Sequence, residues 1–153
     1  MSVPKSVVKV KKDGVEYTSN VDACQYYIFE LNRAALRDVA KFVRAEWKKA
    51  MYEKFEKHTG RAGGVVKSVV LSNKKTKYPR VELGLKNGKP NGFYGFYQEF
   101  GSSRTPKYGI LTDAVESNIP KIIEIESKYL SALEDEAQAL ALISEEEYTD
   151  ENE

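Results

Sequence analysis

The stretch DACQYYIFELNRAALRDVAKFVRAEWKKAMYEKFEK (22–57) decides the fold. Its apolar side chains recur at steps of three and four, which places them on one face of a helix. The members of this face are Ile28, Leu31, Ala35, Val39, Phe42, Val43, Trp47, Ala50 and Met51. Asp22, with Gln25 three positions later, resembles a capping box at the helix start, and Gly60 is a natural stop. We therefore predict one long amphipathic helix.

Shorter β-rich segments lie on both sides of this helix. Residues 65–72 are mostly β-branched, and residues 78–85 alternate apolar and charged side chains, as strands do. Before the helix, residues 5–18 contain the pair Asp13–Gly14, which favours a tight hairpin turn. We predict a hairpin there, with a disordered basic arm as the alternative.

The segment GFYGFYQEFGSS (92–103) is rich in aromatic residues and is interpreted as a further strand. Alternate residues of a strand face opposite sides, so Phe93, Tyr97 and Glu99 share one row. The other row, which suits a core against the long helix, consists of Tyr94, Phe96, Gln98 and Phe100. We expect the first row to face another subunit if the chain's own helices do not cover it. The candidate interface residues are Phe93, Tyr97, Glu99, Arg104 and Tyr108.

The C-terminal third is predicted to be helical and then disordered. Residues 109–118 suit a short helix, and Pro120 suits the first turn of a longer one. The expected inner face of that longer helix is Ile122, Ile123, Glu126, Tyr129, Leu130, Leu133 and Ala137. From Ser144 onward the acidic sequence has no periodicity, which predicts a disordered tail.

Together these segments predict an α+β fold. It has a long N-terminal helix packed on a small, mostly antiparallel sheet, and its C-terminal helices also pack on the sheet. The length of 153 residues suits one domain with appendages. The expected parts are an N-terminal hairpin or arm (1–21), an α+β domain (22–143) and a disordered acidic tail (144–153).

The formal net charge of +1 conceals a steep gradient along the chain. Residues 1–60 carry 12 basic and 8 acidic side chains, and residues 61–107 carry 10 basic and 2 acidic ones. Residues 108–153 reverse the sign, with 2 basic and 13 acidic side chains. Such a chain offers surfaces of opposite charge to its partners, and copies of it can associate head to tail.

The sequence shows no catalytic or metal-binding constellation. His58 is the single histidine and Cys24 the single cysteine, so neither a common zinc site nor an internal disulfide is expected. Glu99 among aromatic residues resembles a general acid in an apolar pocket, but without a second catalytic group a structural role is favoured. We expect no enzymatic activity, no cofactor and no metal.

Membrane insertion and secretion are not expected either. No apolar run approaches the ~20 residues of a membrane helix, and the N-terminus does not resemble a secretory signal. The cytoplasm is the expected place of synthesis and action.

A small basic nucleic-acid-binding protein is the alternative function. Basic side chains attract phosphates and neighbouring aromatic rings can stack on bases. The candidate nucleic-acid-facing residues are Lys74, Lys75, Lys77, Arg80, Lys86 and Lys89.

The segment YGFYQEFGSSRTPKYGILTDAVE (94–116) resembles the signature of the neck and tail-completion (head–tail joining) proteins of long-tailed phages. In that family a Glu–aromatic–Gly–Ser/Thr step is followed by a proline-containing loop and a short helix. The matching residues are Tyr94, Tyr97, Glu99, Phe100, Gly101, Ser102, Pro106, Ile110, Leu111 and Ala114. Upstream, residues 59–61 (Thr-Gly-Arg) and Ser68 resemble the family's Thr-Gly step, and the resemblance covers residues 22–135.

The resemblance implies a structural protein of the virion that is made in the host cytoplasm. It implies a ring of identical subunits at the head–tail joint, stacked on neighbouring neck, head-closure or tail-terminator proteins. DNA would pass through the centre of the ring, and basic residues facing the lumen would touch it without sequence preference.

Overall fold

The computed structural model describes residues 3–5, 7–55, 66–71, 78–85 and 90–150, with the side chains of 7–10, 90–94 and 145–150 left aside. Five α-helices and two small antiparallel sheets confirm the predicted α+β class among these residues. The elements are β1 (Val7–Lys12), β2 (Val15–Ser19), α1 (Val21–Lys54), β3 (Val66–Leu71), β4 (Arg80–Leu85), α2 (Pro90–Phe100), α3 (Ile110–Glu116), α4 (Ile119–Ser131), the 3-10 helix η2 (Ala132–Glu134) and α5 (Glu136–Asp150).

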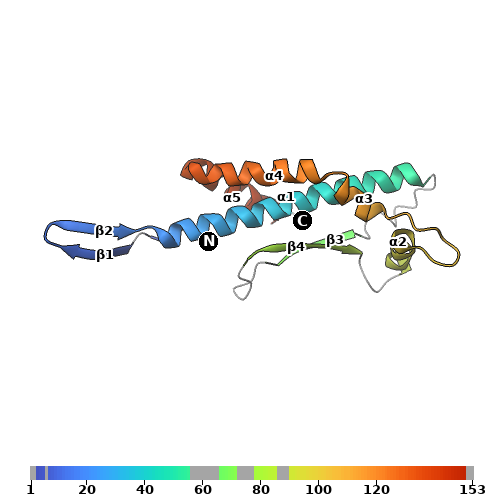
Figure 1. The fold of residues 1–153 in the computed structure, drawn as a ribbon, viewed down its shortest axis with the longest axis horizontal. Coiled ribbons are helices and arrows are strands. Elements are labelled where there is room, and N and C mark those ends of the chain that lie inside the picture. Colours follow the sequence, from blue (N-terminus) through green and yellow to red (C-terminus); the bar gives the residue numbers. More distant parts are fainter. Residues whose placement is uncertain (1–2, 6, 56–65, 72–77, 86–89, 151–153) are drawn as a thin grey trace.

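Helix α1 is the axis of the molecule, and the other elements lie along it (Figure 1). Its 34 residues correspond to about 50 Å at the usual helical rise. Most of the predicted apolar face from Leu31 to Met51 is buried, with Phe42 and Ala50 half-buried, whereas Ile28 is 54% exposed. The predicted capping box is wrong, because the helix starts at Val21 and no side chain caps it. The expected stop at Gly60 lies outside the described residues.

The core consists of two clusters that share α1. Near its first half, Leu31 and Ala35 pack with Tyr129 of α4 and Leu142 of α5. Near its second half, the cluster consists of Trp47, Met51, Val66, Ile110 and Ala114. Helices α4 and α5 therefore pack on α1, and the expectation that they cover the sheet is wrong. In Figure 1, α4 and the β3–β4 sheet lie on opposite sides of α1.

The inner face of α4 is shifted from the predicted one. Tyr129 is buried and Ile125 packs beside it, while Ile123 and Leu130 are more than half exposed. Steps of three and four through Ile122, Ile125 and Tyr129 define the covered face, and the remaining apolar residues form a second one. Pro120 does lie in the first turn, as predicted.

The two sheets are separate hairpins. β1 pairs with β2, with Asp13 and Gly14 in the turn at positive φ, which agrees with the predicted hairpin. β3 pairs with β4, and the side chains of β4 alternate as predicted, with Arg80 and Glu82 exposed and Val81 half-buried.

The predicted strand in the aromatic segment is wrong, because the segment is helix α2. Residues 144–150 of the predicted acidic tail belong to α5, and residues 151–153 lie outside the described residues. In α2, Phe96 and Phe100 are 52% and 59% exposed while Glu99 is buried, so neither predicted row is kept. Steps of three and four through these residues fit a helix as well as alternation fits a strand, and short apolar runs do not separate the two.

Candidate functional site

The candidate site is the turn between α2 and α3, which holds most of the candidate interface residues. We call residues 97–112 the Glu99 turn. Glu99 is only 5% exposed, although it carries a carboxylate. Its Oε2 accepts a hydrogen bond from the Leu111 backbone N–H at 2.7 Å. Its Oε1 accepts from the Thr112 backbone N–H at 3.0 Å and from Thr112 Oγ1 at 2.7 Å.

This carboxylate caps the first turn of α3. The residue in the cap position is Gly109, which has no side chain to accept these hydrogen bonds. Glu99 supplies the acceptor from the preceding helix, and its charge is favoured near the positive end of the helix dipole. The hydrogen bonds occupy both carboxylate oxygens, so the geometry fits a structural role and not a general acid.

Backbone hydrogen bonds fasten the base of the Glu99 turn. Tyr108 N–H donates to Gln98 O at 2.9 Å, and Gly109 N–H donates to Glu99 O at 3.3 Å. Gly101 adopts a φ of +80°, and a Cβ there would lie 3.0 Å from Lys107 N. The chain can reverse at this position only because the residue is glycine.

The tip of the turn is ordered but exposed. Ser102 Oγ accepts hydrogen bonds from the N–H groups of Arg104 (3.2 Å) and Thr105 (3.1 Å). Ser103, Arg104 and Pro106 face solvent. An open pocket beside the tip is lined by Tyr97, Gln98, Ser102, Ser103, Arg104 and Thr105. Gln98 Oε1 is buried there and accepts no hydrogen bond from the described part of the chain.

Tyr108 joins the turn to the end of α1. Its ring meets the Phe55 ring edge to face, with 5.4 Å between centroids, and Lys54 Nζ lies 5.2 Å from its centroid. Tyr108 is half-buried and Glu99 is buried within one copy, and the interface role of both residues stays a prediction. Tyr97 and Arg104 do lie at the pocket. The side chain of Phe93 lies outside the described residues.

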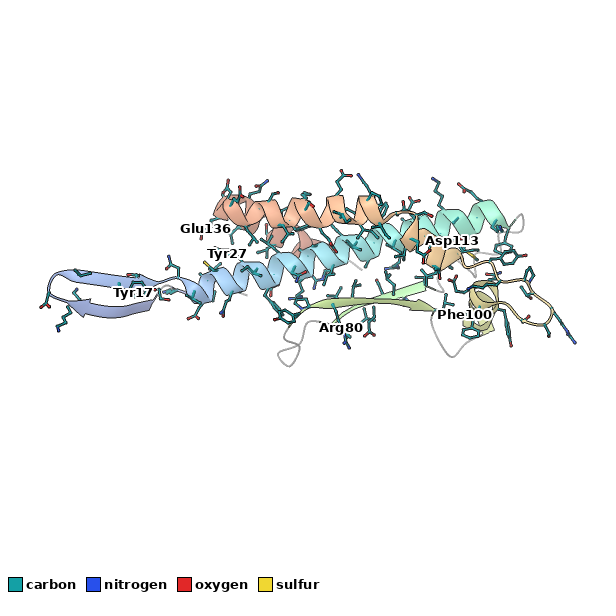
Figure 2. All side chains as sticks on the ribbon, in the orientation of Figure 1. Tyr17, Tyr27, Arg80, Phe100, Asp113 and Glu136 are labelled. Carbon is teal, nitrogen blue, oxygen red and sulfur yellow. The ribbon has the colours of Figure 1, made fainter. Side chains whose placement is uncertain are left out.

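The predicted nucleic-acid-facing residues can be followed only in part. Arg80 is exposed on β4, and its guanidinium forms an ion pair with Glu82 at 3.2 Å. Figure 2 shows it on the sheet, away from Phe100 and the Glu99 turn. The remaining candidates, Lys74, Lys75, Lys77, Lys86 and Lys89, lie outside the described residues.

Sequence reasoning missed the exposed aromatic pair on α2. The rings of Phe96 and Phe100 contact each other, with 4.8 Å between centroids. Their spacing of four residues is the signal that could have identified them, once the segment was considered as a helix.

The described part of the chain has neither a metal-binding cluster nor a membrane-spanning helix. Within the described residues, no group of three His, Cys, Asp or Glu side chains could hold a metal ion. No described helix is both long and apolar enough to cross a membrane. Comparison with known protein families, curated proteins and solved structures finds no match. The functional argument therefore depends on the residues and geometry of this chain.

Proposed function

We propose that this protein is a structural component of the head–tail joint of a long-tailed phage, acts as a ring of identical subunits in virion assembly, and has no enzymatic activity. The observation that carries the proposal is its large surface. The accessible area is 11193 Å², whereas a compact monomer of 17.3 kDa would expose about 7,800 Å². The elongated shape contributes to this excess, and assembly would bury part of it.

The composition of the surface supports assembly. Large apolar side chains are exposed on the hairpin, the first turns of α1, the β3–β4 sheet, α2 and α4. A subunit with two interfaces of standard size loses roughly 1,600 Å² of its own surface. The excess is large enough for two such interfaces, which is what a ring requires of every subunit.

The Glu99 turn supports the family part of the proposal. Glu99 and Gly101 belong to the Glu–Phe–Gly step that resembles the family signature, and both have a demanding structural role here. The turn has a fixed base and an exposed tip, so it can dock without a large loss of chain entropy.

The experiment is the mass of the protein in solution, measured by light scattering over a concentration series, with negative-stain images of the largest species. We expect a discrete oligomer that forms with increasing concentration and appears as a ring. Its mass should depend little on added DNA.

The basic segment 61–107 keeps nucleic-acid binding as the second candidate. If it binds DNA through five or more phosphates, the affinity must fall steeply as salt is raised. A chain that stays monomeric at every concentration and binds duplex DNA in this way would contradict the head–tail proposal and support the alternative.

A further inference from the structure

The N-terminal hairpin of β1 and β2, which we call the arm (residues 7–19), has little tertiary support from the described part of its own chain. It extends beyond the end of α1, away from the other elements (Figure 1). Its strands pack substantially only on each other. An isolated two-stranded hairpin is marginally stable in water, so the arm needs a surface to pack on.

The arm and the first turns of α1 both expose large apolar side chains. These side chains, which we call the arm stripe, are Val15, Tyr17, Val21 and Ile28, each more than half exposed. Figure 2 shows Tyr17 on the hairpin, apart from the helical body. Apolar side chains at this density on a projecting element are typical of a binding surface.

A second exposed stripe lies on α4. Ile119, Ile123 and Leu130 are 4 and 7 residues apart and fall within about 40° of arc on the helix. Each is close to or above half exposed, while Tyr129 on a different face is buried against α1. We call these three residues the α4 stripe. Helix α4 is therefore apolar on two faces, and its own chain covers only one.

The charge next to the α4 stripe is acidic, although α4 as a whole is neutral. The arm and the residues before it contain four lysines against Asp13 and Glu16. Helix α4 carries two lysines and two glutamates, of which Glu126 falls on the side of the stripe at 100° per residue. The other seven acidic side chains of residues 119–150 follow α4, at 134–150. The free edges of the β3–β4 sheet are a poorer partner for the arm, because residues 61–107 are strongly basic. The lengths also match, since the six residues of β1 and the 13 of α4 both extend about 20 Å.

We propose that the arm of one copy lies on the α4 stripe of a second copy. The inference rests on the self-assembly in the proposed function and names the surfaces that perform it. The two surfaces differ, so the contact repeats head to tail and closes into a ring when the rotation between copies permits.

The test mixes two single-cysteine variants, each in a Cys24→Ser background, under mild oxidation. One carries Tyr17→Cys and the other Leu130→Cys; the control partner carries Val69→Cys, at an exposed position of β3. We expect roughly tenfold more Tyr17–Leu130 product than Tyr17–Val69 product, because docking raises the effective concentration of the thiols. Equal yields would overturn the proposal, as would a dominant Tyr17–Tyr17 product, which would indicate contact between two arms.

Charge reversal gives a second, matched measurement. Lys11→Glu with Lys12→Glu should lower the Tyr17–Leu130 yield several-fold, whereas Lys48→Glu with Lys49→Glu on α1 makes the same change in net charge and should not. Equal effects of the two pairs would show that only overall charge matters, and would overturn the docking of the arm on α4.

Light scattering on the Cys24→Ser chain separates this inference from the proposed function. Discrete oligomers without the Tyr17–Leu130 product would overturn the arm contact and leave the ring standing. Monomers throughout, with no specific product, would count against both.

Discussion

At the scale of single residues, Glu99 is the cap of α3. Glu99→Gln removes the charge and replaces one acceptor oxygen by an NH₂ group that faces backbone N–H donors. We expect a loss of about 1–3 kcal/mol in the free energy of unfolding, measured by chemical denaturation. The control is Glu124→Gln, whose exposed ion pair with Lys121 should contribute about 0.5 kcal/mol or less. Equal losses in the two variants would disprove the capping role.

Gly101 is required by its backbone conformation. Gly101→Ala places a Cβ 3.0 Å from Lys107 N at a φ of +80°, and we expect it to cost about 1–3 kcal/mol of stability. Gly84→Ala is the matched control, because a Cβ at Gly84 meets no atom within 4 Å. Thermal unfolding of both variants checks the difference, and a neutral Gly101→Ala would contradict the turn geometry.

Tyr27 contributes to the pH dependence of stability in the alkaline range. Its hydroxyl donates to Glu136 at 2.6 Å, and this bond, with smaller contributions from burial and from the Glu136 charge, raises the pKa of Tyr27 to about 12. The folded state therefore holds this proton more tightly than the unfolded state, whose tyrosine pKa is about 10. The stabilisation is full below about pH 10 and is lost as the pH rises towards 12.

In Tyr27→Phe, the free energy of unfolding should therefore fall less over this alkaline range than in the parent chain. Urea unfolding at several pH values measures this. Tyr17→Phe, on the exposed arm, is the matched control for the loss of a tyrosine hydroxyl. A profile of Tyr27→Phe that matches the parent chain would show that the hydrogen bond to Glu136 contributes nothing.

At the scale of elements, the arm is expected to exchange its backbone amide hydrogens rapidly in the dilute protein. The buried face of α1 from Leu31 to Met51 should be protected under the same conditions, because amides in packed elements exchange only on larger opening. Hydrogen exchange followed by mass spectrometry measures both. Protection of residues 7–19 should appear only at concentrations where oligomers form. An arm protected in the monomer would contradict its lack of support.

The elements also show what the sequence can predict. Helix α1 has enough residues for the period of 3.6 to be unambiguous, and the turn of the N-terminal hairpin follows from Asp13–Gly14 alone. In α2, a few aromatic residues fit both a strand and a helix, and the choice depends on contacts with α3. The loop after α2 brings α3 into these contacts, so the local sequence pattern of α2 does not contain them.

The same limit applies to the candidate site. Glu99 could be singled out from the sequence as a carboxylate among aromatic residues. Its role could not, because its hydrogen-bond donors at Leu111 and Thr112 come 12 and 13 residues later and meet it only after the chain reverses at Gly101. The aromatic composition of the segment suggested a catalytic acid. The capping role depends on the three-dimensional position of the hydrogen-bond donors.

At the scale of the whole molecule, exposed apolar surface is expected to drive assembly. Phe96→Ser with Phe100→Ser should lower the mass seen by light scattering without lowering the melting temperature, because both rings are more than half exposed in one copy. The control is Val69→Ser on β3, which shows whether removal of any exposed apolar side chain lowers the mass. If the melting temperature falls together with the mass, the two rings stabilise the fold of the single subunit.

The partners of α1 come late in the sequence, and this orders events during synthesis. Tyr27 and Glu136 are 109 residues apart, and Tyr129 reaches Asp38 across 91 residues. Because synthesis proceeds from the N-terminus, α1 leaves the ribosome long before the helices that cover it. The first core cluster cannot close, and the α4 stripe does not exist, until residues 119–143 have been translated. If the arm docks on α4 as proposed, a nascent chain would offer its arm to finished subunits before it offers them a place to dock, and growth of the assembly would wait for each new subunit to fold.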